Sequence, residues 1–232
     1  MSEALQQRRV ISRLPRERRV ADIMEAAHDV FCERGYADAS ISDIAERAHV
    51  VEGTIYRYFE NKRELLVRVV GHWYEEMLAD YDTQLSGIKG TRNRLRFLIW
   101  RHLRAIKTDP ALCRLVFSEL RAGPDYRETR VFDLNRDYTR RTLDILRDAI
   151  AAGEFRDDAP LTLVRDMIYG GIEHHSWAFL RGEGDFPLDE TADAITDFVY
   201  RALAVVPADD MTLARIEQAA AKLERLIGKA EA

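Results

Sequence analysis

Hydrophobic residues recur at intervals of three and four along most of the chain, and no segment shows the strict alternation of a half-buried strand. The first set comprises Val20, Ile23, Ala27, Val30 and Phe31, and similar sets continue to about residue 227. This spacing places the apolar side chains on one face of a helix. The sequence therefore predicts an all-α fold.

The composition is that of an ordinary globular protein. Of the 232 residues, 47% are hydrophobic and 32% are charged, which excludes a disordered or fibrous chain. No apolar run approaches the roughly 18 residues of a membrane-spanning helix, and the first residues are too polar for a secretory signal. We therefore expect a cytoplasmic protein without a membrane partner.

The charge is distributed unevenly along the chain. The net charge is −5, yet residues 1–20 contain six arginines and only two glutamates. A basic start on an acidic body indicates that the N-terminal end meets an anion. Residues 1–15 are predicted to form a basic arm, which either contacts that anion or stays in solvent.

Local signals place the boundaries of the first helices. Gly35 ends the first helix in the position that favours a left-handed residue. Ser40 and Asp43 form a capping-box pattern at the start of a second helix, which runs to about Ala48. A short third segment covers 51–58. Asn61 and Glu64 then open a long helix that is predicted to reach about residue 85.

The rest of the chain is predicted to form a bundle of helices. Asp109-Pro110 is a typical helix start, and residues 126–152 carry two apolar stripes, as expected for a helix packed on two sides. The helices expected in this region cover residues 95–106, 110–120, 126–152, 161–181, 189–204 and 211–229.

Two short helices around a tight turn, followed by a long helix, predict a helix-turn-helix motif at about residues 39–59. The segments Gly35-Tyr36, Ser40–Ala45, Gly53–Phe59 and Asn61–Leu66 resemble the DNA-binding domain of the TetR/AcrR family of bacterial repressors. The resemblance covers about residues 16–76. It implies a homodimer on double-stranded DNA, with residues 77–232 as an effector-binding and dimerisation domain.

The predicted recognition helix divides into an inner and an outer face. Ile55 and Phe59 are four residues apart and face the core. On the outer face, Arg57 has the geometry for bidentate guanine recognition, and Gly53 lets the backbone approach the DNA closely. The other outer residues with a predicted contact to a phosphate or a thymine methyl are Thr54 and Tyr56.

The flanking residues complete the predicted interface. The resemblance implies that Tyr58 and Lys62 contact phosphates, and Ser40 and Ser42 can reach the other wall of the groove. The basic arm could follow the backbone or enter the minor groove.

Two positions depart from the family pattern. His49 occupies the turn where the family has glycine, and histidine tolerates the left-handed region better than most residues. Val51 replaces the usual serine or threonine cap of the recognition helix, at a cost of about 1 kcal/mol.

The family resemblance also implies a small-molecule pocket and a dimer interface in the C-terminal region. The candidate pocket residues are Trp73, Met77, Trp100, His102, Phe117, Tyr126, Tyr138, Met167, Tyr169 and Trp177. The candidate dimer residues, on the helices 161–181 and 189–204, are Gly170, His174, Ile195, Phe198, Val199 and Ala202. The segment 167–173 resembles family members that sense fatty acyl thioesters, so this is one candidate class of the expected hydrophobic effector.

The sequence predicts neither a cofactor nor a metal site. Glu173, His174 and His175 are adjacent on a helix and point in different directions, so they cannot easily bind one ion. Cys32 and Cys113 are interpreted as small buried hydrophobic residues. The leading hypothesis is a ligand-released transcriptional repressor. The alternatives are a ligand-independent architectural DNA-binding protein and an enzyme that uses His174 or His175.

Overall fold

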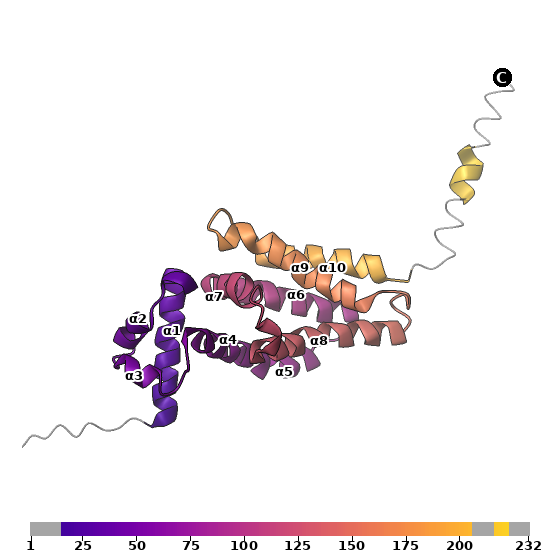
Figure 1. Ribbon diagram of the computed structural model, residues 1–232. Coiled ribbons are helices and arrows are strands. Elements are labelled where there is room, and N and C mark those ends of the chain that lie inside the picture. The colour runs from indigo at the N-terminus through magenta and orange to yellow at the C-terminus, as the bar shows by residue number, and fades with distance from the viewer. Residues whose placement is uncertain (1–14, 206–215, 223–232) are drawn as a thin grey trace, which may run out of the picture. The chain divides into compact units, whose positions relative to one another are not determined.

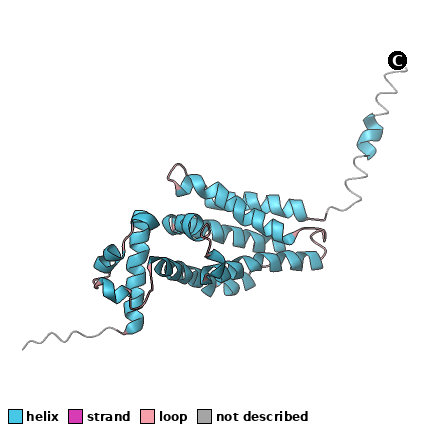
Figure 2. Ribbon diagram, viewed as in Figure 1, coloured by secondary structure: helices cyan, strands magenta, loops and turns pink. Residues whose placement is uncertain are grey.

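The computed structural model describes residues 15–205 and 216–222. Within these ranges the protein is built from helices (Figures 1 and 2), with a single isolated bridge between Phe155 and Ala204. The predicted all-α class is therefore confirmed. The α-helices are α1 (Arg16–Asp38), α2 (Ile41–Arg47), α3 (Glu52–Ile55), α4 (Lys62–Ala79), α5 (Tyr81–Ser86), α6 (Thr91–Thr108), α7 (Pro110–Leu115), α8 (Arg130–Ala151), α9 (Leu161–Leu180) and α10 (Leu188–Leu203).

The chain folds into two compact units, and α6, α8 and α9 each contribute residues to both. The first unit contains residues up to 86, 104–138 and 177–185, and the second contains 87–103, 139–176 and 186 onward. The N-terminal arm, apart from Pro15, lies outside the described residues. Of the predicted helix 211–229, residues 216–222 are described and are helical.

In the first unit, the early helices begin where the sequence predicts. The Ser40 hydroxyl accepts from the Asp43 N–H at 3.1 Å, and the Asp43 carboxylate accepts from the Ser40 N–H at 3.1 Å, which completes the capping box. The Asn61 side chain accepts from the Glu64 N–H at 2.8 Å and caps α4. Gly35 has φ +77°, so α1 bends there as it ends.

The predicted long helix from Asn61 to residue 85 is wrong in one respect. The helix α4 ends at Ala79, and α5 resumes at Tyr81 after Asp80. The interruption lets the Tyr81 ring lie parallel to that of Tyr138, with ring centroids 5.3 Å apart, and Tyr81 is fully buried. The helix is thus interrupted directly before a tyrosine that packs in the core.

Three further boundaries differ from prediction. The third helix is shorter than expected, because α3 ends at Ile55 and a turn follows. A π-helical turn over Val116–Leu120 follows α7, and a 3-10 turn over Tyr126–Glu128 precedes α8. Turns of these kinds depend on packing with distant residues, and no local signal in the sequence indicates them.

In the second unit, α6 and α10 run antiparallel and are joined by a ladder of ion pairs. The Arg92 guanidinium donates to Asp197 at 2.6 and 2.9 Å, and that of Arg96 donates to Asp193 and Asp189 at 2.6–3.1 Å. The buried side chains of this unit include Leu95, Leu98, Ile99, Ile145, Leu146, Ile168, Ile172, Val199 and Leu203. The ladder and this core together fix how α10 faces α6.

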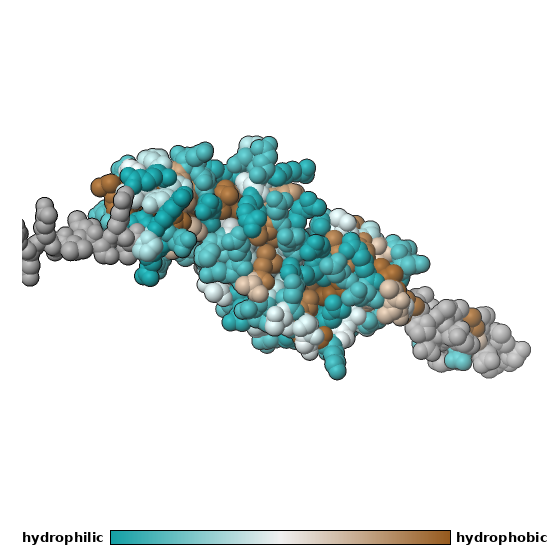
Figure 3. Space-filling view, turned by 90° about the horizontal axis from the view of Figure 1, so that it is seen from below, coloured by the Kyte–Doolittle hydropathy of each residue, from teal (hydrophilic) through white to brown (hydrophobic). Residues whose placement is uncertain are grey.

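The surface carries mostly charged and polar side chains. Figure 3 shows apolar residues in small groups between hydrophilic ones on the visible face. Among the described residues, no helix is both long and apolar enough to cross a membrane.

Candidate nucleic-acid interface and effector-domain sites

Helices α1, α2 and α3 form a small three-helix group with its own apolar core. Side chains from all three helices are buried in the first unit: Ile23, Ala27, Val30, Phe31, Ile44, Ala45 and Ile55. Phe59, which follows α3, is also buried. The inner face predicted for the recognition segment, Ile55 and Phe59, is therefore confirmed, and it fixes which residues of α3 face outward.

The turn between α2 and α3 is tight. His49 has φ +53° and is the non-glycine residue with a positive φ in the described part of the chain. The Val50 N–H donates to the Ala45 carbonyl at 2.9 Å, which closes the end of α2. As predicted, α3 starts without a side-chain cap, because Val51 has no hydroxyl or carboxylate to offer.

The outward side of α3 and of the turn that follows it is exposed to solvent. Glu52, Gly53, Tyr56 and Arg57 are exposed, and Tyr56 retains 54% of its accessible surface. Val51 is 73% exposed, an unusual position for a β-branched apolar side chain. The segment is therefore not buried against its own unit and can reach a partner.

A basic hollow of about 690 Å³ lies beside this face. Arg16, Arg19 and Arg57 line it together with Thr54 and Tyr58. The Arg16 guanidinium lies 5.8 Å from the centre of the Tyr58 ring, a cation–π distance. Three arginines around one hollow create a positive potential where α1 meets α3.

Lys62 occupies a position that the sequence analysis did not predict. Its ammonium donates to the carbonyls of Tyr36 and Ala39 at 2.7 and 2.8 Å, and to that of Ala37 at 3.3 Å. These carbonyls belong to the end of α1, where the helix leaves acceptors without intrahelical partners. The ammonium thus has an acceptor for each of its three hydrogens within the protein, and its phosphate contact stays a prediction.

The two serines at the start of α2 differ in their bonding. The Ser40 hydroxyl donates to the Asp43 carboxylate at 2.6 Å and is part of the helix cap, whereas Ser42 is exposed. Arg34 also pairs with Asp43 at 2.8 Å. Ser42 is therefore the more available of the two for a contact outside the protein.

The candidate effector residues fall in two different units. Trp73, Met77, Phe117, Tyr126, Tyr138 and Trp177 belong to the first unit, and Trp100, His102, Met167 and Tyr169 to the second. In the first unit, Trp73 lines a hollow of about 890 Å³ against α1, and the Phe117 and Trp177 rings lie 6.3 Å apart. Tyr138 is buried under Tyr81, and Tyr126 lies edge-on to Phe132.

In the second unit, Tyr169 is the centre of a small polar group. Its hydroxyl lies 2.9 Å from the Thr142 hydroxyl, and its ring packs edge-on against His102 with centroids 4.9 Å apart. Burial raises the pKa of Tyr169 to about 12. The hydroxyl is protonated at neutral pH and can act as a hydrogen-bond donor at this partly buried position.

Met167 does not lie with the other candidate pocket residues. It is 59% exposed and lines an apolar groove of about 610 Å³ between α9 and α10. Four of the candidate dimer residues line the same groove: Ile195, Phe198, Val199 and Ala202. Gly170 and His174 are exposed on α9 but do not line it.

The groove has exposed apolar side chains on both helices. Phe198 on α10 is 70% exposed and Met167 on α9 is 59% exposed; Leu163, near the start of α9, is 55% exposed but does not line the groove. The α9 side of the groove, which includes Val164, Ile168 and His175, was not predicted from the sequence. Their three- and four-residue spacing with Met167 and Gly171 would have indicated one shared helix face.

Comparison with known proteins assigns both halves of the chain. Residues 23–69 match the family described as "Bacterial regulatory proteins, tetR family", and residues 89–203 match "Tetracyclin repressor-like, C-terminal domain". The "Fatty acid metabolism regulator protein" of Bacillus subtilis is 25% identical over 185 residues, which cover 78% of this chain and 93% of the relative. The transcriptional repressor KstR2 of Mycobacterium tuberculosis is 25% identical over 164 residues, which cover 70% of this chain and 80% of the relative.

Solved structures share the same architecture. The regulator FadR of Bacillus subtilis, crystallised with stearoyl-CoA, superposes with a TM-score of 0.70 at 24% identity, covering 78% of this chain and 97% of that one. The two family matches, the helix-turn-helix geometry and this common fold agree with one another. The chain belongs to the TetR family of bacterial regulatory proteins and is a regulator of transcription rather than an enzyme.

Proposed function

We propose that the protein is a homodimeric repressor that binds a palindromic operator and leaves it when a small hydrophobic effector binds among the C-terminal helices. The observation that carries the DNA-binding part is the exposure of the outer face of α3 beside the arginine-lined hollow. An exposed helix face with a positive flank has the properties required for the major groove and its phosphates.

Arg57 is the proposed base-reading residue. It is exposed, and its guanidinium can make two parallel hydrogen bonds to a guanine edge. Tyr56 and Thr54 lie beside it for contacts to phosphates or thymine methyls, and Gly53 adds no side chain that would hold the backbone away. Tyr58, Ser42, Ser40 and Lys62 are proposed at the edges of the same interface.

A dimer is proposed from the apolar groove between α9 and α10. Exposed Phe198 and Met167 line this groove, and burial of the groove against a second copy would remove large apolar side chains from water. Two copies related by a two-fold axis would present two recognition helices to two half-sites, about one DNA turn apart or at a related spacing.

The effector is proposed to be a fatty acyl thioester. Two comparisons with Bacillus subtilis regulators support this class: the curated relative is named as a regulator of fatty acid metabolism, and the solved FadR structure contains stearoyl-CoA. The Tyr169, His102 and Thr142 group supplies polar atoms beside the apolar side chains of the second unit, as a mainly apolar ligand with a polar end requires.

The DNA-binding part is tested by selection of binding sequences from a random duplex pool with the full-length protein. We expect the selected sequences to contain an inverted repeat. Arg57→Ala should lose base discrimination at one position per half-site, and the lost discrimination should amount to about 1–3 kcal/mol. Arg147→Ala, at an exposed arginine of α8, is the matched control and should select the wild-type sequence. A pool without any consensus would contradict the repressor and support an architectural DNA-binding protein.

The effector part is tested on the selected operator. Stearoyl-CoA, added to the protein–operator complex, should release the DNA, and the operator should weaken stearoyl-CoA binding by the same factor, because the coupling of two binding equilibria is reciprocal. Free coenzyme A serves as the control without an acyl chain. An operator complex that tolerates saturating acyl thioester would exclude this effector class.

A further inference from the structure

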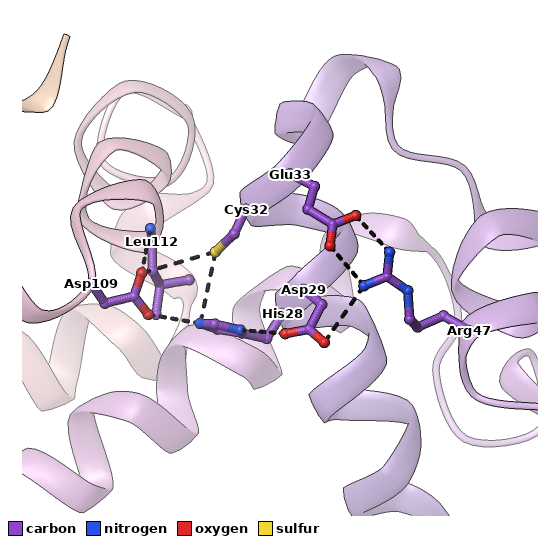
Figure 4. A network of polar contacts seen from close by, with 7 residues as sticks. All are labelled: His28, Asp29, Cys32, Glu33, Arg47, Asp109 and Leu112. Carbon is purple, nitrogen blue, oxygen red and sulfur yellow. Dashed lines mark hydrogen bonds and ion pairs between the residues drawn. The ribbon is translucent and has the colours of Figure 1, made fainter. Parts of the chain in front are cut away.

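Three side chains with metal-binding atoms converge where α1 meets α7 in the first unit (Figure 4). His28 and Cys32 lie one turn apart on α1, and Asp109 precedes α7. The His28 Nε2 lies 2.7 Å from Asp109 Oδ2 and 3.7 Å from Cys32 Sγ, and the Cys32 sulfur lies 4.0 Å from Asp109 Oδ1. One atom from each residue lies within 4.8 Å of the other two.

The cluster is not arranged as a catalytic triad. In a nucleophile–base–carboxylate triad, the two ring nitrogens of the histidine serve different partners. Here the thiol and Asp109 both approach Nε2, while Nδ1 faces the Asp29 carboxylate at 3.3 Å. Sulfur, nitrogen and oxygen thus lie close enough together to contact one ion.

The separations suit a small tetrahedral ion. With bonds of about 2.3 Å to sulfur and about 2.0–2.1 Å to nitrogen and oxygen, tetrahedral ligands lie roughly 3.3–3.6 Å apart. The sulfur would move a few tenths of an ångström toward Nε2 from 3.7 Å, and the pair of Nε2 and Oδ2 would open from 2.7 Å, while the 4.0 Å contact of the sulfur is to the other carboxylate oxygen, Oδ1. Rotations of three partly exposed side chains can supply such changes.

We propose that His28, Cys32 and Asp109 bind one zinc-like divalent ion, which joins α1 to α7. A thiolate, an imidazole and a carboxylate form a mixed, borderline-soft ligand set that favours Zn²⁺ and Co²⁺ over Mg²⁺ or Ca²⁺. Three protein ligands leave a fourth position for water. The inference replaces the expectation from sequence that the protein has no metal site.

Residues around the cluster already orient two of the ligands. The Asp29 carboxylate lies against Nδ1 of His28, and such a carboxylate partner directs Nε2 of a histidine toward a metal. Arg47 holds Asp29 at 3.6 Å and pairs with Glu33 as well. Asp109 Oδ1 accepts from the Leu112 N–H at 3.0 Å, which fixes the carboxylate as the cap of α7.

The site is accessible to a dissolved ion. His28 and Asp109 lie in the wall of the 890 Å³ hollow that α1 shares with α4. His72, Glu25 and Glu76 lie in the same wall. A water molecule on the ion would face this hollow.

Metal binding has to displace a proton from His28. The hydrogen bond to Asp109 raises the pKa of His28 to about 11, so the imidazole is protonated at neutral pH. The ion takes the place of that proton and of the thiol proton of Cys32, and both are released to solvent. The assay is therefore run at about pH 8, where the released protons oppose binding less than at lower pH.

The test uses Co²⁺ as a spectroscopic probe on full-length, chelator-treated protein. We expect the intense visible bands of tetrahedral cobalt and a near-ultraviolet thiolate-to-cobalt charge-transfer band, both saturating at one ion per chain and bleached by Zn²⁺. Cys32→Ser should remove the charge-transfer band. Asp109→Asn should weaken binding at least tenfold while it retains a side-chain oxygen that caps α7.

Two matched controls separate this site from others. Cys113→Ser changes the second, buried cysteine, and His72→Gln changes an exposed histidine of the same hollow. Both variants should bind cobalt as the wild type does. The assignment would be overturned if the wild type showed no saturable cobalt band. It would also be overturned if the charge-transfer band survived Cys32→Ser or disappeared with Cys113→Ser.

Discussion

Replacement of Lys62 by methionine separates two roles for this residue. Methionine keeps the length and most of the apolar stem of lysine but removes the ammonium group. The structure engages that ammonium with three carbonyls at the end of α1, two of them at 2.7 and 2.8 Å. The family resemblance instead implies a contact to a DNA phosphate.

The expected loss of stability follows from these contacts. A hydrogen bond to a charged group contributes about 1.5–3 kcal/mol, and a cation at a helix C-terminus adds about 0.3–1 kcal/mol. The Tyr36 and Ala39 carbonyls are half-buried, so water replaces the ammonium only in part. We therefore expect Lys62→Met to lower the free energy of unfolding by about 2 kcal/mol in urea denaturation.

DNA binding provides the second readout. If the carbonyls hold the ammonium in the complex as well, the salt dependence of operator affinity should stay as in the wild type. A phosphate contact would instead reduce the slope by about one unit per half-site. Unchanged stability together with a reduced slope would refute the role inferred from the structure and support the one implied by the family.

Two further predictions concern the α9–α10 groove and the α1–α7 contact. Phe198→Glu should convert the dimer to a monomer in analytical ultracentrifugation. The melting temperature of the monomer should not fall, because this side chain is 70% exposed on α10. An unchanged dimer would place the interface elsewhere. His28 has a raised pKa of about 11 from Asp109, so the stabilisation from this pair is fully present below about pH 6.5 and is lost as the pH rises toward 11. Since 37% of the His28 side chain is exposed, the loss in the free energy of unfolding should be about 1–2 kcal/mol. It is measured by denaturation at a series of pH values with chelator present. The His28→Gln variant should lack this pH-dependent loss. If the free energy of unfolding changed with pH in the same way in the wild type and in His28→Gln, the stabilising role of the His28–Asp109 pair would be contradicted.

Features set by neighbouring residues could be predicted from the sequence. The capping box of Ser40 and Asp43 and the caps at Asn61 and Asp109 depend on side chains three residues from the amides they serve. The exposed face of α3 was predictable for the same reason, because burial of Ile55 and Phe59 determines where Arg57 points.

Features set by distant residues could not be predicted. The break at Asp80 precedes Tyr81, which packs on Tyr138, a residue 57 positions later, and the partners of Lys62 lie 23–26 residues earlier in the chain. Cys32 was interpreted as a buried hydrophobic residue, yet it is half-buried beside Asp109, 77 residues away. A signal did exist, since His28 and Cys32 share one face of α1 at a spacing of four, but periodicity could not identify the third group.

The ion-pair ladder between α6 and α10 restrains one kind of movement and not another. Its arginines are four residues apart, and Asp189, Asp193 and Asp197 repeat at the same interval. A slide of α10 by one turn, about 5.4 Å, would therefore pair each arginine with the next aspartate, while a rotation about the helix axis would break every pair. The charges therefore set the rotation of α10 about its axis. The position of α10 along the axis depends on the packing of three buried side chains, Ala192, Thr196 and Val199. Substitutions at these three positions should govern whether the helix shifts lengthwise.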